Sequence, residues 1–318
     1  MLPFKLENML ITSSPYIFLT NGGGKTEEER CRDLSRQLKT EIQPEQFICG
    51  HTPMREMAKK YDSVLVVGGQ GEKCRQVAHG YGFKDVITPG DIIKDNEHTT
   101  PFRRLTQEEV DRSVERNFGE HKIDAIFVFA DSTDWAGDQQ IILDLLTSQN
   151  GRIGTTSATF DEGPPIFFSH NDLVWSACHQ NTRLGMGALR GSIEYLFHRI
   201  TGRELFSTAF GKPQVGTFEF ATGLLRQWRK DTHGVDKAPE TVYFVGDTPE
   251  SDIRGTNQYD ESGLAGSSWY SILVRTGVYK EGTKPAYTPK ATVDNVLEAV
   301  KHGIAREALK AREEKATA

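Results

Sequence analysis

Two carboxylates stand five residues apart in the run Val-Gly-Asp-Thr-Pro-Glu-Ser-Asp at 245–252, directly after an apolar stretch. The apolar stretch predicts a buried strand, Gly246 the turn that leaves it, and Pro249 the first residue of a helix. Asp247 would then lie at the carboxyl end of the strand, where open α/β sheets bind ligands, and Asp252 would reach the same point from the helix. Two such oxygen ligands are typical of a Mg²⁺ site. On spacing alone, a helix cap beside a solvated acid is an equal alternative.

Two further segments place phosphate-binding groups after predicted strands. The apolar residues 16–19 predict a strand, and Thr20, Asn21 and Gly22 follow it with a hydroxyl group and exposed amides that can donate to phosphate oxygens. Lys212 stands on a short Phe-Gly-Lys-Pro turn before another predicted helix. A lysine at that position can hold its ammonium group against a phosphoryl group.

A hydroxyl group, a lysine and an acidic pair, in this order and each after a strand, resemble motifs two, three and four of the haloacid dehalogenase (HAD) superfamily. The runs at 185–188 (Gly-Met-Gly-Ala) and 211–213 (Gly-Lys-Pro) are similar to subfamily IIA, the group of NagD-type and p-nitrophenyl phosphatase-like proteins. Residues 168–172 stand where those proteins have Asn-x-Asp. Residues 18–24 and the acidic, Trp-containing segment 129–140 resemble the eukaryotic cat-eye-syndrome-critical-region-five-like branch, many of whose members are mitochondrial.

The resemblance covers the chain from residue 16 to about residue 300 and implies an α/β fold. It implies a HAD-like Rossmannoid core with a parallel sheet that lacks its first strand. An α/β cap of the C2 type, at 62–206, would be inserted between core parts at 1–61 and 207–318, the second of which ends in a charged helical tail. The implied reaction is Mg²⁺-dependent hydrolysis of a small phosphomonoester through an aspartyl-phosphate. The resemblance also leaves open a homodimer formed through the cap.

The resemblance assigns roles to individual residues. Asp247 and Asp252 would hold or orient the Mg²⁺ ion, with Asp247 as the direct ligand. Lys212 would neutralise the phosphoryl charge and position the nucleophile, and the loop at Thr20 would bind phosphate oxygens. Asn257 would support the acidic loop without binding the metal ion directly.

One motif of the superfamily has no counterpart in this sequence. HAD phosphatases carry Asp-x-Asp at the end of the first strand, where the first Asp is the nucleophile and the second the general acid and base. Nineteen residues precede Thr20, none of them is Asp, and the first Asp of the chain is Asp33. Covalent catalysis requires an activated carboxylate, so the chain as written is not expected to hydrolyse phosphate esters.

Two explanations fit this missing motif. The sequence is either an N-terminally truncated form of an ordinary enzyme, or a variant that keeps the scaffold as a catalytically silent binding or regulatory protein. The retained lysine, hydroxyl group and acidic pair favour truncation. Intact mass and N-terminal sequence of the protein from its native source would separate the two explanations. A link to glycerophospholipid metabolism is suggested only by labels on some fungal relatives.

Composition narrows the classes of partner. A net charge of −6 and a pI near 5.9 argue against nucleic acid or an anionic membrane as the main partner. No apolar run approaches the roughly 20 residues of a membrane span. The four cysteines are scattered, as expected of reduced thiols in the cytoplasm or mitochondrial matrix, and no presequence is recognisable. The nine histidines are not expected to join a metal-ligand cluster.

Two motifs in the predicted cap have competing interpretations. Gly69-Gln70-Gly71 follows a strand as in a dinucleotide fingerprint, but Cys74 stands where Gly or Ala is required, which argues against nucleotide binding. Asp134 and Trp135 stand where a strand ends and a helix begins. Helix capping is the favoured interpretation, and the alternative is that the pair selects the substrate.

Hydrophobic periodicity and turn residues predict the elements of the first half of the chain. Loops are expected at 94–105 and 149–164. The expected strands are 16–20, 47–48, 63–67, 85–87 and 124–129, and the expected helices are 26–39, 53–60, 72–81, 106–117 and 136–148.

Overall fold

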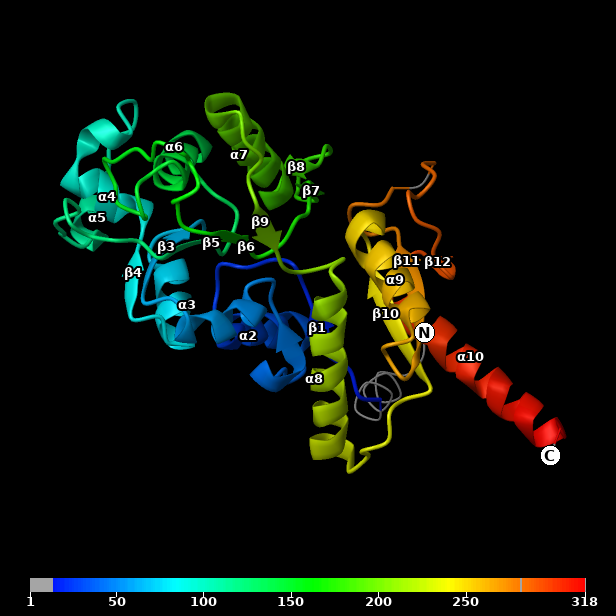
Figure 1. Cartoon of the computed structure of the whole chain (residues 1–318). Helices are drawn as coiled ribbons and strands as arrows, with labels where there is room; N and C mark the ends of the chain where they lie inside the picture. Colours follow the sequence, from blue (N-terminus) through cyan, green and yellow to red (C-terminus); the bar gives the residue numbers. More distant parts are fainter. Residues whose placement is uncertain (1–13, 281, 318) are drawn as a thin grey trace. The chain divides into compact units, whose positions relative to one another are not determined.

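The computed structural model describes residues 14–280 and 282–317 of the chain. It divides into two compact units, each treated by itself below (Figure 1). Unit 2 holds Phe18–Val174 and Leu184–Gly211. Unit 1 holds Trp175–Arg183 and Lys212–Ala318 with the described residues before Phe18. No helix within the described ranges is long and apolar enough to cross a membrane.

A five-stranded parallel sheet forms the centre of unit 2. Its strand order is β4-β3-β5-β6-β9, so the chain first adds β4 on one side of β3 and then adds β5 on the other. The strands are β3 (Ser63–Val67), β4 (Asp85–Ile87), β5 (Ala125–Val128), β6 (Ile166–Phe168) and β9 (Ser207–Ala209). Their central residues are apolar on both faces, as parallel strands covered on both sides require.

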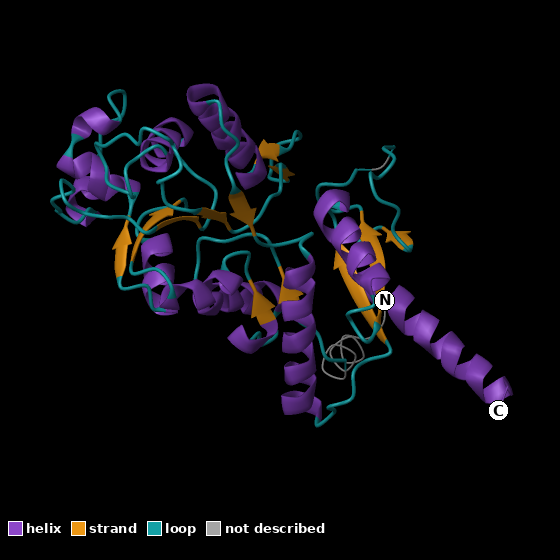
Figure 2. Cartoon of the chain, viewed as in Figure 1, coloured by secondary structure: helices purple, strands orange, loops and turns teal. Residues whose placement is uncertain are grey.

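Helices cover both faces of this sheet, as Figure 2 shows. Alternate side chains such as Leu65 and Ile126 pack against α4 (Pro89–Asp95), α6 (Trp135–Leu146) and α7 (Met186–Thr201). Their neighbours in sequence face the 3₁₀ helix η2 (Thr52–Lys59) and α3 (Lys73–Tyr81) on the other side. Unit 2 is therefore a three-layer α/β/α arrangement.

The remaining short elements of unit 2 surround this sheet. β1 (Phe18–Leu19) and β2 (Phe47–Ile48) form a separate parallel pair, and between them runs α2 (Glu27–Leu38). Thr26 caps α2 in a full capping box with Glu29, which fixes where the helix begins. The other elements are η1 (Pro44–Gln46), η3 (Glu97–Thr99) and α5 (Gln107–Arg112). A further two-stranded pair, β7 (Val174–Trp175) and β8 (Arg183–Leu184), includes residues of both units.

Unit 1 is built on a second parallel sheet with the order β10-β11-β12. Its strands are β10 (Thr241–Gly246), β11 (Ser268–Val274) and β12 (Ala291–Val293). One face packs on α8 (Val215–His233) and α9 (Arg254–Ser262) around Trp269, and the other on α10 (Val296–Thr317). The turn after β10 continues into a π-helical segment, η4 (Pro249–Ile253), which leads directly into α9.

The expected strands at 47–48, 63–67 and 85–87 are confirmed to the residue. The expected loop at 94–105 is wrong at its start, because Thr88 caps a helix with Pro in its first turn and α4 extends through Asp95. The helix expected at 106–117 ends at Arg112. The main-chain amide of Val114 donates to the buried Asp91 carboxylate at 2.7 Å, which draws the chain out of helical conformation.

The strands expected to form one core sheet lie in two sheets, β1-β2 and β10-β11-β12. Among the described residues, no strand pairs with the outer edge of β10. The expected helix at 53–60 forms as the 3₁₀ helix η2, which begins one residue earlier. The expected strand at 16–20 is limited to the two residues that pair with β2.

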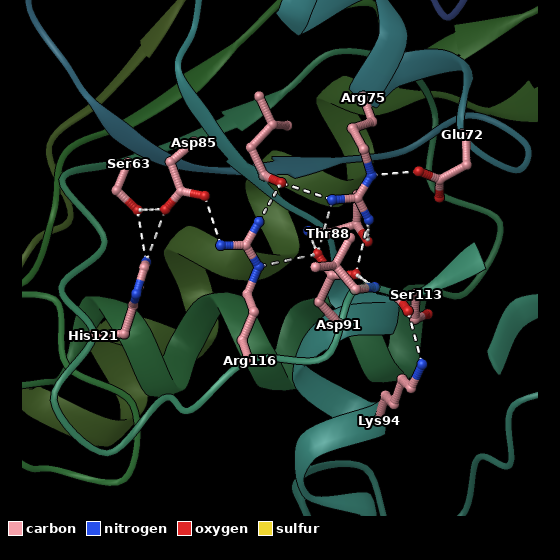
Figure 3. A network of polar contacts seen from close by, with 12 residues as sticks. Ser63, Glu72, Arg75, Asp85, Thr88, Asp91, Lys94, Ser113, Arg116 and His121 are labelled. Carbon is pink, nitrogen blue, oxygen red and sulfur yellow. Dashed lines mark hydrogen bonds and ion pairs between the residues drawn. The ribbon is translucent and has the colours of Figure 1, made fainter. Parts of the chain in front are cut away.

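A buried ion network ties α4 to α3 (Figure 3). The Asp91 side chain is fully buried and accepts hydrogen bonds from the Arg75 guanidinium group at 2.8 and 2.9 Å. It also accepts from the main-chain amides of Thr88 and Val114. Arg75 donates further to the Val86 carbonyl, so the charged pair is hydrogen-bonded on both sides. Such a pair depends on both partners, because loss of the Asp91 charge would leave the buried Arg75 guanidinium group without its two-pronged acceptor.

Asp91→Asn should therefore lower the free energy of unfolding of unit 2 by about 3–5 kcal/mol, the cost of breaking a buried pair. Denaturant unfolding followed by circular dichroism measures the change. Asp62→Asn is the matched control, because Asp62 pairs with Lys84 at 73% and 74% side-chain exposure and should change stability by less than about 1 kcal/mol. Equal effects of the two substitutions would contradict the role given to Asp91.

A second buried acid, Asp138, lies in the first turn of α6 and accepts a hydrogen bond from the Ser132 hydroxyl group at 2.6 Å. Burial raises its pKa from 3.8 to about 6, and the nearby Asp134 carboxylate adds to the rise. Folding therefore favours the protonated acid. Ionising the buried Asp138 carboxyl group costs free energy in the folded state. This cost is absent below pH 3.8, the ordinary pKa, and complete above the raised pKa of about 6. The free energy of unfolding therefore falls as the pH rises from about 4 to about 6.

Asp138→Asn should remove that fall and raise the free energy of unfolding at pH 7 by about 2 kcal/mol, the order expected for a shift of this size. Unfolding curves at pH values from 4 to 7 measure it, and the variant should match the parent protein at the acidic end. Asp111→Asn, at an exposed position on α5, should leave the pH profile unchanged. A parallel shift of the whole curve for the Asp138 variant would show that titration is not the cause.

Candidate functional site

The acidic loop after β10 is organised around the carboxylate of Asp252. Its Oδ2 accepts hydrogen bonds from the main-chain amides of Asp247 and Thr248, both at 2.9 Å. Its Oδ1 accepts from the Lys212 ammonium group at 2.6 Å, and both side chains are buried. Lys212 also lies 5.6 Å from the centre of the Phe244 ring. The predicted lysine and acidic pair thus come together within unit 1.

Asp247 lies at the carboxyl end of β10, as the sequence predicts. Its Oδ2 accepts the main-chain amide of Val278 at 2.7 Å, and its carbonyl accepts that of Tyr279. The loop after β11 therefore holds the Asp247 carboxylate in place. The described side-chain bond uses only Oδ2 of the carboxylate, so Asp247 can present Oδ1 to a ligand.

Two glycines make room for these carboxylates. A Cβ atom at Gly277 would lie 1.9 Å from Asp247 Oδ2, and one at Gly246 would lie 2.3 Å from the Asp252 carboxyl carbon. Neither distance is compatible with a real side chain. Gly246 was expected only as a turn residue, and Gly277 was not identified as part of the site.

Asn257 lies on α9, where its amide donates to the Thr288 carbonyl at 2.9 Å and its oxygen accepts from the Ser271 hydroxyl group at 2.8 Å. These bonds connect α9 to β11 and to the segment before β12. The described hydrogen bonds of Asn257 therefore do not run to the acidic loop, and its predicted support of that loop stays a prediction.

The predicted phosphate-binding loop lies in unit 2, after β1. The Gly22 amide donates to the Thr20 hydroxyl oxygen at 3.1 Å, so this predicted phosphate donor is engaged within the loop. The buried Asn21 donates its side-chain amide to Asp172 at 3.0 Å. Sequence inspection had placed Asp172 in the Asn-x-Asp segment without a partner.

Asp172 belongs to a group of polar residues after β5 and β6. Its main-chain amide donates to His170 Nδ1 at 3.3 Å, and its Oδ2 lies 3.7 Å from the same nitrogen. Burial raises the pKa of the nearby Asp131 carboxyl group, which His170 partly counters. The segment is thus a titratable cluster that holds the Asn21 side chain.

The prediction that no histidine joins a metal-ligand cluster is wrong, because His51 lies in a group of residues with metal-ligand spacing. Ligand atoms of Glu27, Cys49 and His51, all buried, lie within 4.8 Å of one another. The Tyr81 hydroxyl group lies between two of them, donating to Glu27 at 2.6 Å and contacting His51 Nδ1 at 2.7 Å. Burial lowers the pKa of His51 to about 4, so the ring is neutral near pH 7. Hydrogen bonds connect the Glu27 carboxylate, the Tyr81 hydroxyl group and His51 Nδ1, whereas His51 Nε2 is buried without a hydrogen-bond partner among the described residues.

Asp134 is the N-cap of α6, with its Oδ1 accepting the Gly137 amide at 3.2 Å. The capping interpretation is thus confirmed. Its Oδ2 accepts from Arg103 at 3.0 Å, an interaction that links α6 to the loop before α5. Trp135 is partly buried and packs against the apolar core beneath α6. A substrate-selecting role for the pair stays a prediction.

Comparisons with known proteins identify the scaffold. A family described as haloacid dehalogenase-like hydrolase matches residues 5–84, and one described as HAD-hydrolase-like matches residues 209–299. A mitochondrial hydrolase of Saccharomyces cerevisiae is 37% identical over 309 residues, which cover 90% of this chain and 85% of that protein.

A Schizosaccharomyces pombe protein named as a fusion of CMP-forming cardiolipin synthase and a mitochondrial hydrolase is 38% identical over 293 residues. The match covers 92% of this chain, which spans 48% of that protein. The fold is similar to a crystal structure of a possible sugar phosphatase of the HAD superfamily from Cytophaga hutchinsonii, with a TM-score of 0.59 and 16% identity over 92% of this chain and 85% of that one. The chain therefore belongs to the haloacid dehalogenase superfamily.

Proposed function

We propose that this chain is a HAD phosphatase scaffold that binds a small phosphomonoester and Mg²⁺, and that the residues of this sequence do not by themselves hydrolyse the ester. The observation that carries the proposal is the buried contact between Lys212 and Asp252 at 2.6 Å, in which Asp252 also accepts the main-chain amide of Asp247. A buried cation and an acidic strand end are the groups that phosphate and its metal ion require. As a separate proposal within unit 2, the Thr20 hydroxyl group would bind a phosphate oxygen.

The donor set of the acidic loop fits Mg²⁺, which uses one or two carboxylates and keeps several waters. Asp247 would be the direct ligand, since its described side-chain bond uses only Oδ2. Asp252 would orient rather than coordinate, because both of its oxygens already accept hydrogen bonds. Mg²⁺, when bound, would offset the charge of a phosphoryl group.

Lys212 would neutralise phosphate charge while remaining paired with Asp252. Its ammonium group donates to Asp252 at 2.6 Å. Hydrolysis would also require a carboxylate to attack phosphorus and an acid to protonate the leaving alcohol. Among the residues of this sequence no Asp precedes Asp33, so these residues alone supply neither group. Binding without turnover is therefore proposed for these residues taken by themselves.

The relatives suggest where such a ligand would be found. Both are named mitochondrial hydrolases, which supports a mitochondrial location for this protein as a proposal. One of them is named as a fusion with a cardiolipin synthase, and this favours a phosphorylated intermediate of glycerophospholipid metabolism as a second candidate ligand class. A homodimer through the predicted cap at 62–206 is a further proposal. Nucleic acid is not a proposed partner, given the net charge of −6.

A phosphatase assay over a panel of phosphomonoesters, with and without Mg²⁺, tests the proposal. The chain should show no turnover above the buffer rate, whereas calorimetry should detect binding of Mg²⁺ and of inorganic phosphate. Lys212→Met should weaken phosphate binding about tenfold or more, the effect of losing a charge-assisted hydrogen bond. Turnover that disappears with Asp247→Asn would refute the silent scaffold and establish an active enzyme.

Gly277→Ala tests the metal site without changing any ligand. The added methyl group must displace the Asp247 carboxylate, so Mg²⁺ affinity measured by calorimetry should fall at least about tenfold, as when a supporting residue is lost. Gly216→Ala is the matched control, because a Cβ atom there meets nothing within 4 Å. Unchanged Mg²⁺ affinity in the Gly277 variant, with the fold intact, would show that Asp247 is not the metal ligand.

A further inference from the structure

Three buried side chains that can bind a metal ion come together in unit 2. Glu27 lies in the first turn of α2, and Cys49 and His51 lie in the segment that joins β2 to η2. Their ligand atoms lie within 4.8 Å of one another. A point therefore exists at about 2.8 Å or less from all three atoms, and carboxylate, imidazole and thiolate groups bind Zn²⁺ at about 2.0–2.3 Å. A small closure of the side chains would produce a metal site.

The Glu27 carboxylate is buried, and the ion pair described for it is long. Its partner is Arg55 at 3.4 Å, whose side chain is 54% exposed. Its Oε1 also accepts hydrogen bonds from the hydroxyl groups of Tyr81 at 2.6 Å and Thr52 at 2.8 Å. The described side-chain bonds of Glu27 thus all end on Oε1. This leaves Oε2 as a ligand atom, and a divalent cation there would offset the cost of burying the negative charge.

His51 supplies a lone pair to which nothing donates in the described part of the chain. Tyr81 has one hydroxyl hydrogen, which goes to the Glu27 carboxylate because a carboxylate only accepts. At the 2.7 Å contact between Tyr81 and His51 Nδ1, the ring is therefore the donor. The neutral ring then carries its lone pair on Nε2, which is buried and unpartnered among the residues described. In a ring that is 0% exposed, such an orphaned acceptor indicates an ion or a water that completes it.

The same hydrogen bonds orient the ring in the way that metal-binding histidines are oriented. A ligating histidine usually donates its other ring N–H to an acceptor that fixes the ring. Here His51 Nδ1 donates to Tyr81, and Tyr81 in turn donates to Glu27. The ring also stacks on Phe129, with 5.5 Å between the ring centres. An ion at Nε2 would therefore break none of the described hydrogen bonds of His51.

The ligand types select the kind of ion. Mg²⁺ and Ca²⁺ prefer oxygen ligands, so sulfur and nitrogen beside one carboxylate argue against both. Thiolate, imidazole and carboxylate together are typical of Zn²⁺, and three protein ligands leave a fourth position for water. The thiolate of Cys49 and the carboxylate of Glu27 would also balance the two charges of the ion. Because Cys49 binds as the thiolate, its proton passes to the solvent as the ion enters.

We propose that these three residues form a zinc-binding site, in which Glu27 Oε2, Cys49 Sγ and His51 Nε2 hold the ion. The ion would tie the start of α2 to the segment after β2. The loop at Thr20 packs on the same histidine, since a Cβ atom at Gly23 would lie 2.8 Å from His51 Cδ2. Bound zinc would therefore hold this loop as well, and it would stabilise unit 2 to an extent set by its affinity and concentration.

Titration of the intact chain with metal ions tests the proposal. The purified protein is freed of metal with a chelator and titrated with Co²⁺ in excess Mg²⁺, then with Zn²⁺ against a chromophoric chelator. The expected result is a thiolate-to-cobalt charge-transfer band in the near ultraviolet that saturates at one Co²⁺ per chain and disappears when one equivalent of Zn²⁺ is added. Cobalt binding without this band, or no binding, would overturn the zinc site and assign the Nε2 acceptor to a buried water.

Graded variants identify the ligands. Cys49→Ser should lower the zinc affinity more than about a hundredfold, and Tyr81→Phe, which removes only a group that orients His51, about 10- to 100-fold. Cys178→Ser is the matched control, because Cys178 is an exposed thiol outside the cluster and its loss should leave the affinity unchanged. Equal losses for the two cysteine variants would overturn the assignment. If Cys49→Ser does not fold, as circular dichroism would show, the cobalt band of the parent protein decides.

The zinc site uses none of the residues that carry the proposed function. The cobalt band should therefore persist in Asp247→Asn, and the Mg²⁺ affinity should be unchanged in Cys49→Ser. Loss of the band in Asp247→Asn would overturn the zinc site. If Mg²⁺ and phosphate fail to bind while the band is intact, the zinc site stands and the proposed function fails.

Discussion

Parallel strand pairing is the constraint on which both units depend. Each pair of parallel strands needs a crossover, so the polar residues that end one strand gather at the same edge as those of its neighbours. The strands themselves are apolar because helices bury both faces, which leaves their carboxyl ends as the place for polar chemistry. In unit 1 this edge carries Asp247, and in unit 2 the edge of the five-stranded sheet carries the loops after β3 and β5.

Polar groups at these edges are held by one another rather than by solvent. Asp252 gathers a lysine and two main-chain amides, and Asp91 gathers an arginine and two amides. In both cases a carboxylate accepts from several donors, which offsets the free-energy cost of burying its charge. The same principle explains why two glycines flank the acidic loop, because a side chain would occupy the volume that the carboxylates need.

Short-range patterns made the strands predictable from sequence. The run Ser-Val-Leu-Val-Val at 63–67 can only be a buried strand of this length, and the helix after Thr26 begins where its capping box predicts. Asp247 was predictable because strand, turn and proline occur in order. What could not be predicted depends on contacts between distant residues. The contact of Asp172 with Asn21 joins positions 151 residues apart, and the early end of α5 depends on a bond from Val114 to Asp91.

The pairing of the Lys212 ammonium group should govern how the proposed phosphate site of unit 1 binds its ligand. The Lys212–Asp252 pair is buried, and separating it would leave a charge without a partner. An anion at Lys212 must therefore be added beside Asp252 rather than exchanged for it. Because that places two negative groups on one ammonium, a divalent cation at Asp247 becomes a condition of tight phosphate binding rather than an addition to it.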